Sequence, residues 1–209
     1  MAVVSSDGMV SDGCALKAVF FDFDSTLSMP QFIKRAGDYA VADRVELCMG
    51  LEDDEVFANF GGAARVGRIR ETLERLRSHD VTLFIISLGV SRVIRHHLDV
   101  VGLGEFFASQ LLFGQDSPRL ARAGHKKAVL IQQLLQEHSM EPEDALFVDD
   151  SRTHIQLCRR LGACDVFQVE GNGLTPKELD ALDARAGLAA LGAGGPPADP
   201  PSAAAEFDN

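Results

Sequence analysis

The sequence lacks the features of metal-finger, disulfide-rich and membrane-spanning proteins, and it is typical of a globular protein with a packed core. It contains no tryptophan and one tyrosine, and its four cysteines form no CxxC pair. The spacing of Cys14, Cys48, Cys158 and Cys164 excludes a recognisable zinc-finger pattern and indicates reduced thiols. The longest apolar stretch, 81–86, is far shorter than the roughly 20 residues that span a bilayer, which excludes a transmembrane helix.

Basic residues are also scarce relative to acidic ones. The 20 lysines and arginines face 31 aspartates and glutamates, and the net charge is −11. Such a surplus repels phosphate backbones and anionic lipid headgroups, so we expect neither nucleic-acid nor membrane binding. The N-terminal segment MAVVSSDGMVSDG has neither the basic nor the apolar part of a secretory signal, and we therefore expect a cytoplasmic protein.

The length of 209 residues suffices for one sizeable domain. The first residues are small and polar, and the last ones are rich in Gly, Pro and Ala. We therefore predict a flexible N-terminal tail over 1–15, one domain over 16–190 and a disordered C-terminal tail over 191–209.

Within that domain, apolar runs of strand length alternate with segments of helical period. This alternation predicts an α/β fold with a doubly wound, Rossmann-like parallel sheet of about five strands flanked by helices. Several runs are continuously apolar, as strands that are buried on both faces should be. The expected strands are 17–22, 81–87, 109–114, 145–150 and 165–169, and the expected helices are 66–78, 90–101, 127–137 and 151–161.

The segment 31–60 is longer than a crossover needs, so it is interpreted as a small helical cap inserted after the first strand. Its period predicts one helix over 31–49, followed by the acidic patch 52–55. An insertion this short would only partly roof a site at the sheet edge. Two possibilities stay open: the substrate projects from the pocket, or a second subunit closes it, so the protein is either a monomer or a homodimer.

The strongest chemical signal is the string FFDFDST, in which an apolar strand runs directly into Asp22 and Asp24. Ligands of open parallel sheets bind at the carboxyl ends of strands, so both carboxylates are placed for a shared pocket. Such a pair can act as nucleophile or metal ligand and as general acid and base. The alternative is a turn with two capping aspartates.

Two more strand ends carry polar groups. Ser87 is followed by Leu88 and Gly89, and a hydroxyl with free N–H groups before a helix suits a phosphate, although Ser87 is equally compatible with a helix cap. Asp149 and Asp150 end another apolar strand. Acidic strand ends repel each other unless a cation lies among them, which predicts a Mg²⁺ site. One of these two aspartates is expected to support the site rather than bind the metal.

Lys126 and Lys127 open a predicted amphipathic helix, where an ammonium group could reach a phosphoryl group. Lysines that flank helices are usually solvated, so this signal is weak by itself. The order of the four signals along the chain is more specific than any one of them.

In that order, the motifs DFDST, IIS, a helix-opening lysine and VDD resemble a haloacid dehalogenase-like phosphohydrolase with a small or minimal cap. The resemblance extends over 17–169. It implies that Asp22 is the nucleophile that forms an aspartyl-phosphate and that Asp24 is the general acid and base. An acid at the position of Asp24 also favours phosphate ester hydrolysis over the dehalogenase branch.

The resemblance further implies a substrate-binding set and a metal-binding set. Thr26, Ser87, Leu88, Gly89 and Lys127 match the substrate-binding positions, with Lys127 fitting better than Lys126. Asp22, Asp24, Asp150 and its neighbour Asp149 match the positions around Mg²⁺. Many relatives carry a further aspartate where this chain has His154, which puts the metal affinity in question more than the activity.

The sequence thus predicts a Mg²⁺-dependent phosphatase that acts on a phosphorylated small molecule or macromolecule. The alternatives are a catalytically inactive domain with a binding or regulatory role, and a phosphotransferase or phosphoprotein phosphatase of the same superfamily. A run of five arginines, Arg65, Arg68, Arg70, Arg75 and Arg77, alternates with glutamates and is interpreted as a salt-bridged, solvated helix face.

Overall fold

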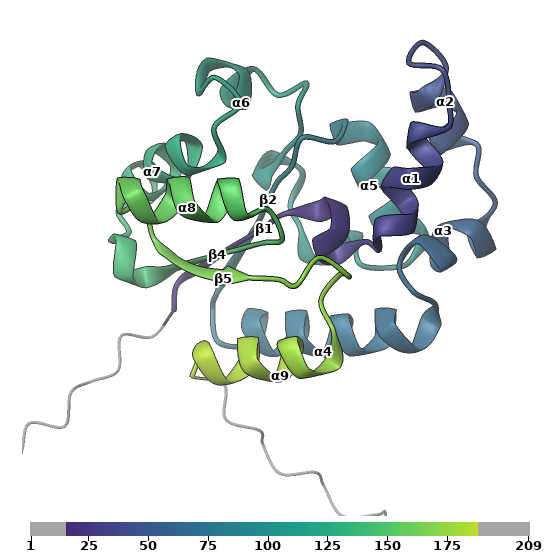
Figure 1. Cartoon of the computed structure of the whole chain (residues 1–209). Helices are drawn as coiled ribbons and strands as arrows, with labels where there is room; N and C mark the ends of the chain where they lie inside the picture. Colours follow the sequence, from purple (N-terminus) through teal and green to yellow (C-terminus); the bar gives the residue numbers. More distant parts are fainter. Residues whose placement is uncertain (1–15, 188–209) are drawn as a thin grey trace, which may run out of the picture.

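The computed structural model describes residues 16–187 and contains a five-stranded parallel sheet between helices (Figure 1). The strand order is β3-β2-β1-β4-β5, which confirms the predicted fold class and all five predicted strands. The predicted tails 1–15 and 191–209 lie outside the described residues. The strands are β1 (Ala18–Phe21), β2 (Thr82–Ile86), β3 (Leu112–Phe113), β4 (Ala145–Asp149) and β5 (Asp165–Gln168).

The helices follow the predicted ranges closely in the second half of the chain. They are α1 (Pro30–Gly37), α2 (Arg44–Met49), α3 (Asp53–Asn59), α4 (Ala63–Ser78), α5 (Ser91–Val100), α6 (Pro118–Arg122), α7 (Lys127–Glu137), α8 (Arg152–Leu161) and α9 (Pro176–Arg185). Helix α9 was not predicted. None of the helices in the described part of the chain has the length and apolar content to cross a bilayer.

Alternate residues of the central strands enter two separate hydrophobic cores. In β1, Val19 and Phe21 pack on the side of α4, α5 and α9, whereas Ala18 and Phe20 pack on the side of α6, α7 and α8. Figure 1 shows α4 and α9 on one face of the sheet and α7 and α8 on the other. Burial on both faces explains why these strands are continuously apolar.

The insertion contains three helices, so the prediction of a single helix over 31–49 is wrong. Helix α1 ends at Gly37, and α2 begins only at Arg44; α1 buries Phe32 and α2 buries Cys48. Phe32 of α1 meets the ring of Phe23 with centroids 6.0 Å apart. The acidic patch does not form a loop: Glu52 caps α3 reciprocally with Glu55.

The arginine-rich helix α4 is ion-paired, as predicted, but mainly to other elements. Arg68 and Arg75 both reach Asp183 of α9, at 3.2 and 2.5 Å, while the contact of Arg68 with Glu71 of its own helix measures 3.5 Å. These pairs fasten α9 to α4. The prediction does not hold for Arg65, which is partly buried and turns inward, as described below.

Candidate active site

Asp22 leaves β1 at its carboxyl end and begins a tight turn over Phe23–Leu27. The sheet continues into this residue, because the Asp22 N–H donates to the carbonyl of Val148 at 2.9 Å. Ser25 has a φ of 58°, in the left-handed region that non-glycine residues rarely adopt. The turn therefore needs support from the surrounding chain.

That support comes from a distant loop and from one arginine. Gly173 and Leu174 donate their N–H groups to the carbonyls of Ser25 and Thr26, at 3.0 and 2.8 Å. The guanidinium of Arg65 donates to four main-chain carbonyls, and two of these belong to the turn itself. The acceptors are Thr26 at 3.1 Å, Leu27 at 2.8 Å, Phe60 at 2.8 Å and Leu174 at 3.0 Å.

Lys127 lies in the centre of the site. Its side chain is 2% exposed, and Nζ lies 2.6 Å from Asp22 Oδ1 and 2.7 Å from Asp149 Oδ2. Burial would lower the pKa of this ammonium, but the two carboxylates raise it, so Lys127 stays charged. Lys126, by contrast, is exposed. The structure thus brings Lys127 into the site and leaves its neighbour in solvent.

The two aspartates after β4 have different surroundings. Asp149 is fully buried, and its oxygens accept from Ser151 N at 2.7 Å, from Lys127 and from His154 Nδ1 at 3.2 Å. Burial would raise the pKa of Asp149, but the His154 hydrogen bond and the Lys127 charge hold it below its ordinary value. Asp150 is half-buried, and no other side chain of the described residues donates a hydrogen bond to it.

Three carboxylates converge closely enough to share a cation. Asp22, Asp149 and Asp150 each offer an oxygen, and these oxygens lie within 4.8 Å of one another. Carboxylate oxygens are the ligands that hard divalent cations prefer, so this set fits Mg²⁺. The side chain of Asp24 is not part of the cluster, and its role as a ligand stays a prediction.

Asp24 turns instead toward the end of β2. The Ser87 hydroxyl donates to Asp24 Oδ2 at 3.3 Å, and the Gly89 N–H donates to Ser87 Oγ at 3.1 Å. Leu88, between them, is 42% exposed and lines the cavity described below. Thr26 is fully buried, does not line that cavity, and its hydroxyl has no partner among the described residues.

Three of the four carboxyl groups of the site, those of Asp22, Asp24 and Asp150, have raised pKa values and hold protons more tightly than usual. Burial raises the pKa of Asp22 to about 8, against the opposing charge of Lys127 and with the help of Asp149 and Asp24. Burial also raises the pKa of Asp24 and, together with the charge of Asp149, that of Asp150. The site thus contains four carboxyl groups and one ammonium group, that of Lys127. Positive charge is therefore in short supply there.

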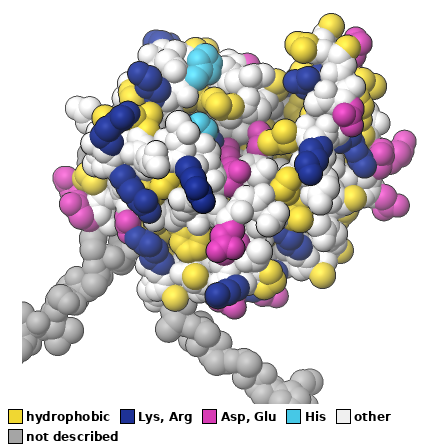
Figure 2. Space-filling view, viewed as in Figure 1, with side chains coloured by type: hydrophobic (Ala, Val, Ile, Leu, Met, Phe, Trp, Pro, Cys, Tyr) yellow, Lys and Arg dark blue, Asp and Glu magenta, His cyan; other side chains and the backbone are white. Residues whose placement is uncertain are grey.

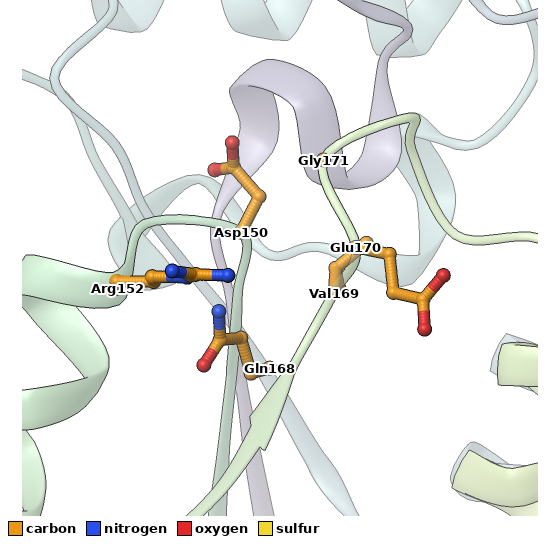
Figure 3. A pocket seen from close by; sticks show the side chains of 6 residues that line it. All are labelled: Asp150, Arg152, Gln168, Val169, Glu170 and Gly171. Atoms are coloured by element: carbon orange, nitrogen blue, oxygen red, sulfur yellow. The ribbon is translucent and has the colours of Figure 1, made fainter.

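A cavity of about 190 Å³ opens onto these groups and is lined by Asp22, Asp24, Ile33, Leu88, Lys127, Asp150, Ser151 and His154. Figure 2 shows acidic side chains in the middle of this face, with basic side chains to the left and both hydrophobic and basic side chains to the right. A neighbouring cavity of about 540 Å³ touches the site only at Asp150. In Figure 3 the Asp150 carboxylate points away from Arg152 and Gln168, which line that second cavity.

A model of the haloacid dehalogenase-like hydrolase family matches residues 64–167, about half of the chain. The match includes Lys127, Asp149 and Asp150, whose side chains lie close to Asp22, and Ser87, whose hydroxyl contacts Asp24.

The chain belongs to the haloacid dehalogenase-like superfamily.

Solved structures agree with this at the level of the fold. A putative beta-phosphoglucomutase from Thermotoga maritima is 17% identical with a TM-score of 0.52, and the alignment covers 81% of this chain and 99% of that one. The haloacid dehalogenase-like domain of effector protein Lem4 from Legionella pneumophila is 13% identical with a TM-score of 0.51, covering 82% and 95%. No curated protein sequence matches significantly. At these identities the likeness shows the shared fold alone.

As a haloacid dehalogenase-like hydrolase, the chain also contains site residues that its motifs did not reveal. Ile33 of α1 reaches the cavity from the insertion, which carries no recognisable motif. Ser151 and His154 line it from the start of α8, and of these the sequence had drawn attention only to His154. Arg65 was assigned to a solvated helix face.

Proposed function

We propose that this protein is a Mg²⁺-dependent phosphatase that hydrolyses a phosphomonoester through an aspartyl-phosphate on Asp22. The observation that carries the proposal is the contact of Lys127 Nζ with both Asp22 and Asp149, at 2.6 and 2.7 Å, beside a surplus of carboxylates. Phosphoryl transfer asks a protein mainly to position a nucleophile and to neutralise the charge on the transferred oxygens.

Asp22 is suited to be the nucleophile. Its side chain is 6% exposed, yet it lines the cavity of about 190 Å³, and Lys127 fixes one oxygen. The other oxygen is left to attack phosphorus in line. Lys127 then stands beside the phosphoryl group and balances part of its charge. Bound Mg²⁺, held by Asp22, Asp150 and the support of Asp149, would supply the remaining positive charge.

Asp24 is suited to be the general acid and base. Burial raises its pKa, which favours the protonated form that a general acid needs in order to give a proton to the leaving oxygen. After that transfer the ionised Asp24 can take a proton from the water that attacks the aspartyl-phosphate. The Ser87 hydroxyl donates to Asp24 at 3.3 Å and orients it. Ser87 is fully buried and Leu88 lines the cavity, so phosphate binding by Ser87 and by the main chain of Leu88 and Gly89 stays a prediction from the resemblance.

The setting is expected to be cytoplasmic and reducing. Cys48, Cys158 and Cys164 are free thiols in the structure. A phosphorylated small molecule or macromolecule as substrate, and no nucleic-acid partner, remain the expectations from the acidic charge balance of the chain.

The test is phosphate release from a panel of phosphomonoesters with and without Mg²⁺. Asp22→Asn should lower the rate by about a thousandfold or more, because the amide cannot act as the nucleophile. Asp180→Asn changes an exposed carboxylate of α9 and is the matched control, which should keep its activity. Wild-type protein that releases no phosphate from any member of the panel would favour the inactive-domain alternative, and full activity of Asp22→Asn would refute the mechanism.

A further inference from the structure

A third cavity, different from the one beside Arg152 and Gln168, continues directly from the candidate active site. It has a volume of about 360 Å³, lies between α1, α2 and the start of α5, and shares Asp24, Ile33 and Leu88 with the cavity at Asp22. We call it the cap groove. Since Asp24 is the group that would protonate the leaving oxygen, the cap groove lies on the leaving-group side of the site. Its volume falls within the roughly 300–1,000 Å³ of small-molecule pockets.

The walls of the cap groove are mainly apolar. They include Phe32, Ile33, Ala36, Val45, Val93 and Ile94. Among the described residues five large hydrophobic side chains are exposed, and three of them, Ile33, Val41 and Leu88, line this one groove. Exposed apolar side chains that gather in a concave surface mark a binding site more often than isolated ones do.

One cation interrupts the apolar lining. Arg44 of α2 is the single lysine or arginine in the wall, and it forms no ion pair with any residue that the structure describes. Its buried Nε has no hydrogen-bond partner there, and a guanidinium nitrogen makes one long contact, 3.4 Å, with the carbonyl of Tyr39. A buried donor without a partner is costly, and a carboxylate of a ligand would satisfy it.

We propose that the substrate is a phosphomonoester of a small apolar alcohol that carries a carboxylate, with the apolar part in the cap groove and the carboxylate on Arg44. This inference rests on the proposed function, since it places the phosphoryl group beside Asp22. Sugar phosphates fit poorly, because their hydroxyl groups would lose water against walls that offer few hydrogen-bond partners.

A matched series of phosphate esters tests the proposal. Hexyl phosphate and glucose 6-phosphate have the same number of carbons, and we expect kcat/KM to be about tenfold or more higher for hexyl phosphate, since each buried methylene contributes about fourfold. The phosphate ester of 6-hydroxyhexanoate should exceed hexyl phosphate by about tenfold, and that of 6-aminohexanol should fall below it. Equal values across the series would overturn the proposal while leaving the phosphatase assignment intact.

Three variants locate the effect. Arg44→Gln should remove the advantage of the carboxylate ester over hexyl phosphate. Ile33→Gln should lower kcat/KM for hexyl phosphate, whereas Leu47→Gln should not. Ile33 and Leu47 are similarly exposed, at 46% and 45%, and both lie in the insertion, but Leu47 does not line the groove. An equal decrease of kcat/KM in Ile33→Gln and Leu47→Gln would refute the assignment of the groove as the binding site.

A direct binding measurement tests the cap groove independently of phosphatase activity. Methyl resonances of Val93 and Ile94 should shift when 6-hydroxyhexanoate is titrated into the full chain, even if no phosphatase activity is found. No shift would overturn the proposal. A second copy of the chain is the competing occupant, so a concentration-dependent dimer that Ile33→Gln dissociates, as seen by sedimentation, would also contradict it.

Discussion

Replacing Lys127 by methionine tests how the buried charges of the site are balanced. Lys127→Met keeps an unbranched side chain but removes Nζ, which contacts Asp22 at 2.6 Å and Asp149 at 2.7 Å. Asp149 is fully buried and would remain ionised with only the His154 hydrogen bond and one N–H as partners. Removing one partner of a buried ion pair costs about 3–5 kcal/mol, so we expect a loss of that size in unfolding free energy at neutral pH.

The loss depends on pH in a defined direction. The pKa of Asp149 lies below its ordinary value of 3.8, so its pairing stabilises the fold above that pH and the contribution disappears as the pH falls. The pKa of Lys127 lies above its ordinary value of 10.5, so its contribution persists up to that pH and is lost as the pH rises further. The part of the difference between wild type and Lys127→Met that comes from the Lys127–Asp149 pair should therefore be full between these two values and shrink on either side.

The assay is urea unfolding of the metal-free protein at several pH values. Lys126→Met is the matched control, because this neighbouring side chain is exposed, and it should change the unfolding free energy by less than about 0.5 kcal/mol. Equal losses in the two variants, or a loss for Lys127→Met that does not change with pH, would refute the reasoning.

Three further predictions concern other parts of the site. Arg65→Lys should lower the unfolding free energy by about 2–4 kcal/mol in urea titrations, because a lysine cannot serve the four carbonyls that the guanidinium binds, and a loss below about 1 kcal/mol would count against this role. Burial lowers the pKa of His97 from its ordinary 6.5, so the stability of wild type relative to His97→Gln, which can still donate to the Cys48 carbonyl, should fall as the pH drops below 6.5. A difference between the two proteins that does not change with pH would contradict this. Asp150→Ala should weaken Mg²⁺ binding, measured by calorimetry, more than Asp149→Ala does, and the reverse order would exchange their roles.

Much of this fold could be predicted because its signals are local. The runs AVFF and ALFVD are continuously apolar since β1 and β4 are buried on both faces, and Lys127 stands at a fixed place in the helical period. Asp22 and Asp150 directly follow these two strands. Because the carboxyl ends of parallel strands lie at one edge of the sheet, the sequence was enough to predict that the two carboxylates lie close together.

The insertion and its surroundings could not be predicted in the same way. The break between Gly37 and Arg44 depends on where two short helices meet the domain, which no local pattern records. The inward turn of Arg65 depends on carbonyls from three separate segments. Helix α9 does carry a local signal in the sequence, the capping box of Thr175 and Glu178 with Pro176 between them.

The central claim is that Asp22 becomes phosphorylated during turnover. The most direct test is to quench the working enzyme in acid, digest it and locate the phosphoryl group by mass spectrometry. The account predicts a phosphoryl group on the peptide that contains Asp22, present only with Mg²⁺ and substrate and missing in Asp22→Asn. Phosphoryl transfer to any other residue, or turnover with no phosphorylated peptide from a rapidly quenched burst, would contradict it.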